Sequence, residues 1–345
     1  MKYVNMFFGT LWRNRLVVAI FIGAYFLFLF VLFPFNDLSN FITSAVAEGT
    51  RNQVYVQADQ MNVHFLPQPA ISAENLTVDI ASPPGSRQLG PLEAKWAKVT
   101  PGLFSVLFNL PALLKAQAGG LPPEVLAKLS GHIRAEGIWN GDADLSVGSG
   151  KKGESGAARS RVSLMLDKIN LQQVRQWADL PVPLSGTGSV AAEFLIAPQM
   201  EDQPEGDFEM NMSAVKMSTW TDINSGLVLP ELKLTDVSAK GRLVGGSLIV
   251  EELRFGKSQD PLSGRIKGNM AINFRQQNGM TQALPGQYNF TVELDMNPTV
   301  QKALGTFLAV MITPDKKADG STHYLFRASG QSFAVIPNLT RVSSF

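Results

Sequence analysis

The spacing of apolar and polar positions divides the chain into three parts. Residues Leu16 to Phe33 are about 18 uncharged, apolar residues, long enough as a helix to cross a bilayer. In Asp37–Gln53 apolar residues recur every three or four positions, which predicts an amphipathic helix. From Val54 the period changes to two and holds almost to the C-terminus, which predicts many strands.

The strand-like segments alternate cleanly, which is typical of antiparallel sheets with one apolar and one solvated face. The helical pattern returns only in Asn170–Trp177 and Thr299–Val310. We therefore expect a mainly β fold: a single N-terminal transmembrane helix, then an elongated, curved antiparallel β-sheet with a few short helices. Gly245-Gly246 predicts a two-residue hairpin turn. The clearest alternating runs are 54–58, 76–80, 143–147, 162–166, 208–214, 266–274 and 288–296.

A loose repeat of Gly-punctuated strand pairs favours a sheet that grows by adding hairpins over one closed barrel. Four stretches share this theme: 129–147, 184–196, 238–255 and 261–274. Such a sheet either folds over as a sandwich or curls into a groove for lipid tails or another chain. The candidate groove residues are Met210, Met212, Met270, Ile272, Phe290 and Val292. The alternative is that these side chains pack only against one another.

The N-terminal apolar run follows Lys2, Arg13 and Arg15, with no acidic residue before it. The positive-inside rule predicts a cytoplasmic tail at 1–15, a span at 16–35 and a periplasmic domain at 36–345. A signal peptide cleaved after Ala45-Val46-Ala47 is an alternative, although the apolar run is longer than a signal peptide needs. The helix at 37–53 is expected to pack on the first strands or, alternatively, to lie on the membrane surface.

Three other segments interrupt the strand pattern. Lys98–Gly120 is dense in Leu and Phe but too broken for a second span, so we expect short helical or loop pieces. Its apolar residues belong to the core or, alternatively, contact a membrane or partner: Leu103, Phe104, Leu107, Phe108 and Leu110. The stretch Gly148–Ala158 is polar and Gly-rich, and the stretch Pro198–Gly206 is polar and acidic. Both compositions predict flexible loops, at 148–158 and 198–206.

Composition narrows the function classes. The 30 basic and 29 acidic residues nearly balance, so nothing indicates nucleic acid as a partner. The chain has no cysteine, which excludes disulfides, thiolate metal sites and cysteine nucleophiles. Three isolated histidines, His64, His132 and His323, lack metal-site spacing, and Glu251-Glu252 is best interpreted as solvated charges or a bulge. We expect a non-enzymatic protein without a metal or another cofactor.

The order of several motifs resembles a known family. They are FPFNDLSNFI (33–42), the apolar segment 99–120, DKINLQQVRQWADLPVPLSGTGSV (167–190) and the long stretch 226–273. This order resembles the protein N family of type II secretion systems (the general secretion pathway), which is itself similar to AsmA-like proteins. The resemblance implies an inner-membrane-anchored periplasmic component of protein secretion, acting through protein contacts. It implies, as the alternative, an AsmA-like lipid-binding or lipid-transfer protein whose partners include phospholipid.

Overall fold

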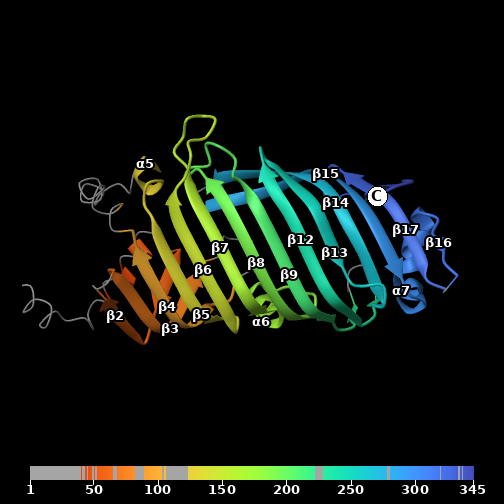
Figure 1. The fold of residues 1–345 in the computed structure, drawn as a ribbon, viewed down its shortest axis with the longest axis horizontal. Helices are drawn as coiled ribbons and strands as arrows, with labels where there is room; N and C mark the ends of the chain where they lie inside the picture. The colour runs from red at the N-terminus through yellow and green to blue at the C-terminus, as the bar shows by residue number, and fades with distance from the viewer. Residues whose placement is uncertain are drawn as a thin grey trace, which may run out of the picture.

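The chain forms one long, open antiparallel sheet (Figure 1). The computed structural model describes residues 40, 43–44, 46–48, 50, 53–64, 68–81, 89–102, 105, 123–221, 228–277, 280–318, 320–332, 335 and 337–345. The 16 strands of the sheet are β1 (Val54–Gln57), β2 (Gln60–His64), β3 (Ala70–Ile80), β4 (Leu92–Pro101), β5 (Gly131–Ile138), β6 (Gly141–Ser149), β7 (Ser160–Asn170), β8 (Leu184–Ile196), β9 (Glu205–Met217), β12 (Leu232–Val244), β13 (Ser247–Phe255), β14 (Leu262–Gln277), β15 (Met280–Met296), β16 (Asp315–Lys316), β17 (Thr322–Gly330) and β18 (Asn338–Arg341).

The topology is a meander. From β3 to β9, and again from β12 to β15, each strand pairs with the next one along the chain. Between these two runs, β10 (Trp220–Thr221) and β11 (Val228–Leu229) form a separate two-stranded sheet. The labelled helices are short: α5 (Pro123–Leu126), α6 (Leu171–Trp177) and α7 (Pro298–Met311). The predicted mainly β, antiparallel sheet built from successive hairpins is therefore confirmed.

Local predictions also hold where the structure describes them. Every alternating run named above coincides with a strand, except that Ala58 follows the end of β1, and the two predicted helices correspond to α6 and α7. Gly245 and Gly246 connect β12 to β13 with φ angles of 55° and 74°. Positive φ at both central residues is the signature of a type I′ hairpin turn, a conformation that glycine adopts without steric cost.

The predicted membrane span lies outside the described residues, as do the tail at 1–15 and most of the segment 98–120. Of the predicted helix at 37–53, residues 40, 43–44 and 46–48 are helical. The Thr43 hydroxyl donates a hydrogen bond to the Val56 carbonyl of β1 at 2.8 Å, so this helix contacts the first strand. In the described part of the chain, no helix combines the length and apolar character needed to cross a bilayer.

The predicted flexible loops are bound to each other. The Ser155 hydroxyl donates to the Asp202 carboxylate at 2.8 Å, and this bond, together with the nearby Arg159, lowers the pKa of Asp202. The Arg159 side chain is 5% exposed and pairs with Asp202 at 3.5 Å and with Glu205 at 2.9 Å. The hairpin end between β6 and β7 is thus fastened to the one between β8 and β9.

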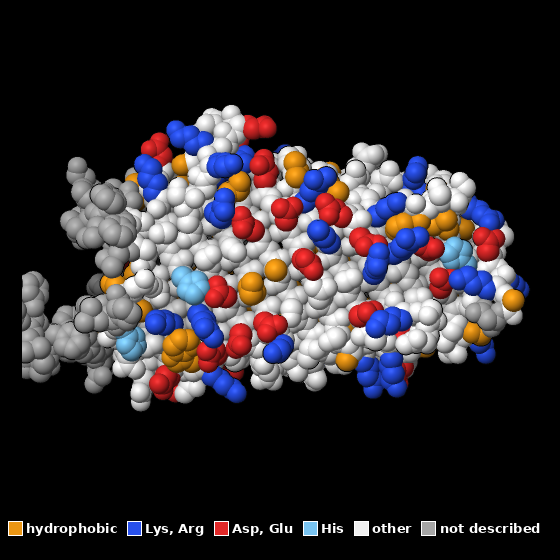
Figure 2. All heavy atoms as spheres, in the orientation of Figure 1, with side chains coloured by type: hydrophobic (Ala, Val, Ile, Leu, Met, Phe, Trp, Pro, Cys, Tyr) orange, Lys and Arg blue, Asp and Glu red, His pale blue; other side chains and the backbone are white. Residues whose placement is uncertain are grey.

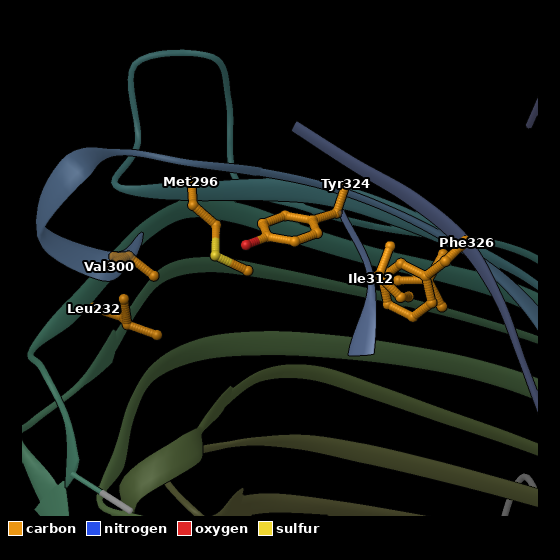
Figure 3. Close-up of a cluster of buried hydrophobic side chains, with 7 residues drawn as sticks. Leu232, Met296, Val300, Ile312, Tyr324 and Phe326 are labelled. Atoms are coloured by element: carbon orange, nitrogen blue, oxygen red, sulfur yellow. The ribbon is translucent and has the colours of Figure 1, made fainter. Parts of the chain in front are cut away.

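The main buried core lies at the C-terminal end of the sheet (Figure 3). The Asn297 side chain caps α7 by accepting a hydrogen bond from the Val300 amide, at 2.9 Å. Figure 3 shows side chains of β15, β17 and α7 on the inner side of the curved sheet, where they meet. The buried members of this cluster are Leu232, Val292, Met296, Val300, Ile312, Tyr324 and Phe326.

A second, thinner cluster lies toward the N-terminal end. Its buried members are mostly alanines, Ala94, Ala97 and Ala135, together with Ile138. Because these side chains are small, this cluster buries little apolar volume, whereas large side chains fill the core at the C-terminal end. Of the strands between these clusters, β12 contributes Leu232 to the C-terminal one, whereas no residue of β7, β8 or β13 is a member of either.

Candidate functional site

The strand register places a continuous row of apolar residues across one side of the sheet. Each residue in the row is the direct partner of the next on the neighbouring strand, from β2 to β17. The row runs Met61, Ala73, Ala97, Ala135, Ala143, Leu166, Val190, Met210, Ala239, Leu253, Ile266, Val292 and Phe326. We call the side of the sheet that contains this row the apolar face.

Bulges keep the apolar residues in phase. Along β13, both Val250 and Leu253 lie on the apolar face, although an odd spacing would normally put them on opposite faces. The register shift between them turns Glu251 and Glu252 to the other side, where they pair with Arg242 and Arg254. The predicted bulge at this glutamate pair is confirmed, and its effect is to preserve the apolar face.

Aromatic rings on the apolar face lie over glycines of the neighbouring strand. A Cβ atom added to Gly241 would lie 2.8 Å from the Phe208 ring, and one added to Gly264 would lie 2.8 Å from the Phe255 ring. Four Phe–Gly pairs and one Tyr–Gly pair are in direct register: Phe194–Gly206, Phe208–Gly241, Phe255–Gly264, Phe290–Gly268 and Tyr288–Gly330. The missing side chain lets the ring lie low over the sheet, so large apolar groups line the face without filling it.

The predicted groove residues all lie on the apolar face, but in two different settings. Phe290 and Val292 belong to the C-terminal packing, Val292 as a buried member and Phe290 as a partly buried neighbour. Met210, Met212, Met270 and Ile272 are half-buried and belong to neither core cluster. Their contact with an acyl chain stays a prediction.

The other large residues of the central strands share this half-buried state. Leu164 and Leu166 on β7, Phe208 on β9 and Leu248 on β13 are neither buried nor fully exposed. The short helix α6 packs on β7 and β8, and these side chains still stay half-buried. Half-covered Leu, Met and Phe side chains on adjacent strands form the kind of contiguous apolar surface that marks an interaction site.

The opposite side of the sheet is charged (Figure 2). Figure 2 shows acidic and basic side chains mixed over this side, and many are cross-strand partners such as Arg161–Glu193 and Arg265–Glu293. Opposite charges on neighbouring strands, directly opposite for Arg265 and Glu293 and diagonal for Arg161 and Glu193, stabilise the pairing of the strands. The sequence therefore builds one wetted side and one apolar face from the same strands.

The three histidines lie in polar contacts. His64 Nε2 is 2.8 Å from the Ser72 hydroxyl, and His132 Nε2 is 2.8 Å from the Asp144 carboxylate. His323 Nδ1 is 3.0 Å from the Asp295 carboxylate. Burial alone would raise the pKa of Asp295, but hydrogen bonds from Lys317 and His323 outweigh this effect, so the pKa is lowered. The described residues contain no group of three or more His, Asp or Glu side chains placed to hold a metal ion.

The predicted partner-contact residues Leu103, Phe104, Leu107, Phe108 and Leu110 lie outside the described residues. Their role stays a prediction. Comparison with protein-family models, with curated proteins and with solved structures gives no match.

Proposed function

We propose that the chain binds the acyl tails of a lipid along the apolar face. The observation that supports this most directly is the unbroken apolar row across the sheet, whose larger residues on the central strands belong to neither core cluster. An acyl tail needs a long, apolar and undirected surface, and it needs no catalytic group. Half-buried Met, Leu, Val and Phe side chains offer that surface.

The dimensions of the central region suit one tail. Five strands, β7, β8, β9, β12 and β13, cross the middle of the row, and none of their row residues belongs to a core cluster. With neighbouring strands about 4.8 Å apart, they span roughly 19 Å. One leaflet of a bilayer is about 15 Å of hydrocarbon, half of the roughly 30 Å core. Each buried CH₂ group contributes about 0.8 kcal/mol, so a tail along this region would be held firmly.

The variant Met210→Lys places a charge in the middle of the apolar row, and Met165→Lys is its matched control. Met165 lies on the charged side of β7 and is 59% exposed. We expect full-length wild-type chain to capture a photoreactive diacyl phospholipid. Capture should fall several-fold in Met210→Lys, because a desolvated ammonium is costly beside hydrocarbon, and stay unchanged in Met165→Lys.

Peptide mapping of the captured lipid gives the location, and a melting curve shows that each variant is folded. Wild-type chain that captures no lipid would contradict the proposal. Equal capture by the two lysine variants would contradict it as well.

The position of such a groove in the cell is part of the proposal. An anchor at 16–35, with the N-terminus cytoplasmic, would fix the chain in the bacterial inner membrane and leave residues 36–345 in the periplasm. The N-terminal strands would then lie next to a source of lipid. This part rests on the sequence pattern of residues 1–35.

A second proposal is a structural, non-enzymatic role in a type II secretion apparatus. Beyond the family resemblance, its support is that the sheet stays open and ends on short strands, β1 at one end and β16 and β18 at the other. Open strand edges accept a further strand from a partner. Deletion of the gene should abolish export of secreted enzymes, and the tagged chain should co-purify with secretion proteins; normal export in the deletion strain would contradict it.

A further inference from the structure

A polar cavity lies where α6 meets the first strands, apart from the central apolar region. Its volume is about 550 Å³, within the usual range for small-molecule sites. Its walls come from β3, β4, the turn between β5 and β6, and α6. Trp139 and Asn140 of that turn face Gln173, Gln176 and Trp177 of α6 across the cavity lining.

The helix that forms one wall is firmly placed. The Asn170 side chain caps α6 by accepting hydrogen bonds from the amides of Gln172 and Gln173. Leu171 is 3% exposed and lies against Gly188 on the apolar face. At the other end of α6, the Trp177 carbonyl accepts a hydrogen bond from the Gly90 amide at 2.8 Å. These contacts put the cavity at the border of the apolar face.

The opposite wall holds a strained tryptophan. Trp139 and Asn140 form the two-residue turn between β5 and β6 with φ angles of 47° and 62°. Asn tolerates this left-handed conformation, but a bulky residue such as Trp rarely adopts it. The ring of Trp139 packs edge-to-face with that of Trp177, their centroids 5.1 Å apart and their planes at 61°. Local strain that the surrounding structure maintains is a recurring mark of ligand sites.

Several polar groups of the cavity lack partners among the described residues. The side-chain amides of Asn140, Gln173 and Gln176 make no hydrogen bond with any described residue. The indole Nε1 of Trp177 is buried, and no described residue accepts its hydrogen. Asn140 and Gln176 are exposed and Gln173 is half-buried, so the three amides are open to a ligand. The missing partner of the buried indole N–H is the unusual feature, because buried polar groups are normally satisfied. Together these groups indicate a ligand with several hydrogen-bonding groups.

Charge and shape narrow the class of ligand. Glu93 and Lys95 line the cavity with opposite charges, so it favours neither an anion nor a cation. No arginine is among the described residues that line it. Amides donate and accept hydrogen bonds with hydroxyls, while indole rings pack against the C–H surface of a sugar ring. We propose that this cavity binds a neutral sugar, either as a free glycan or as the head group of a lipid.

The test uses the full-length chain in a detergent without a sugar head group, since a glycosidic detergent would occupy the cavity. The soluble probes are cellobiose, maltose and N,N′-diacetylchitobiose. The lipid probes are monoglucosyl diacylglycerol and, as the counterpart without a sugar, phosphatidylethanolamine. Binding is measured by saturation-transfer NMR and titration calorimetry.

The pocket variants are Gln173→Leu and Trp177→Phe, and Gln172→Leu is the matched control. Gln172 precedes Gln173 on α6 but is exposed and does not line the cavity. We expect Gln173→Leu to weaken sugar binding about tenfold, which corresponds to about 1.4 kcal/mol. Trp177→Phe keeps an aromatic ring, removes the N–H group and should weaken binding several-fold. Gln172→Leu should bind as the wild type does.

Each result decides the proposal. Binding of a free sugar that the pocket variants weaken supports a glycan ligand; binding of the glucosyl lipid alone, weakened in the same way, supports a lipid head group. No binding of any sugar probe, or sugar binding that the pocket variants leave unchanged, would overturn it. The Met210→Lys variant separates this site from the acyl groove, because it should impair capture of the diacyl phospholipid and leave free-sugar binding intact.

Discussion

At the scale of single residues, two arginines near the start of β7 occupy opposite environments. Arg159 is 5% exposed and bridges Asp202 and Glu205, whereas Arg161 is 52% exposed and pairs with Glu193. A buried ion pair contributes little when intact, but removing one partner leaves an uncompensated charge. An exposed pair contributes little in either case. The two positions therefore form a matched pair two residues apart.

We predict that Arg159→Met lowers the free energy of unfolding by more than Arg161→Met does, because Arg159 is buried between two carboxylates and Arg161 is exposed. Arg161→Met should lower it by less than about 1 kcal/mol. Urea unfolding at neutral pH measures both values. Because the pKa of Asp202 is lowered in the folded chain, its contribution is present above the ordinary aspartate pKa of about 3.9 and fades below it. The cost of Arg159→Met should shrink accordingly in acid; a constant cost, or equal costs at the two sites, would contradict this account.

At the scale of elements, the packing of two paired strands depends on which atoms lie next to a glycine in one of them. Gly241 lies on the apolar face, where an added Cβ would approach the Phe208 ring to 2.8 Å and the Ile249 carbonyl to 2.5 Å. Gly148 lies in β6 on the charged side, opposite Arg161, and an added Cβ meets no atom within 4 Å. The packing around Gly241 therefore leaves no room for a side chain, whereas the space around Gly148 has room for one.

Gly241→Val is therefore expected to lower the free energy of unfolding by about 1–3 kcal/mol, because it overpacks the Phe208 ring. Gly148→Val should be neutral or slightly stabilising, because valine suits a strand better than glycine does. Thermal unfolding of the two variants measures the difference. A stable Gly241→Val chain would show that the ring moves away freely and that the pair has no structural role.

The strand alternation was predictable from the sequence, and the pairing between strands was not. Phe208, Met210 and Met212 alternate with charged and polar residues, so one segment alone reveals that a strand has two unlike sides. The contact of Phe208 with Gly241 depends on the register of two segments 33 positions apart. In general, contacts between residues that are far apart in the sequence cannot be predicted from local patterns.

The candidate sites show the same division. The methionines of the apolar face were predicted from period-two alternation. The cavity between Trp139 and Trp177 was not, because it joins a hairpin turn to a helix. The ion pair of Arg159 with Asp202 was missed because composition alone predicts two loops and says nothing of a bond between them. The only local signal for the cavity was Trp-Asn, an unusual pair for a tight turn between strands.

At the scale of the molecule, a packed core covers the apolar face of the sheet at its C-terminal end. The large side chains of α7, β15 and β17 fill the C-terminal end, whereas the large apolar residues of the central strands are half-buried. A ligand along the apolar face should therefore change the environment of the central strands and leave both the C-terminal core and the charged side unchanged. Methionines happen to occupy all three environments.

Methionine oxidation by peroxide then reports where an acyl chain lies, because thioether oxidation follows exposure. Met210, Met212 and Met270 are half-buried on the apolar face, Met165 is 59% exposed on the charged side, and Met296 is 2% exposed in the core. In the lipid-free chain we expect Met165 to oxidise fastest and Met296 slowest. A bound diacyl phospholipid should slow oxidation of the three apolar-face methionines several-fold and leave Met165 and Met296 unchanged. Slowing at all five would indicate a global change in stability rather than occupancy, and no slowing at the three while lipid is bound would place the lipid elsewhere on the protein.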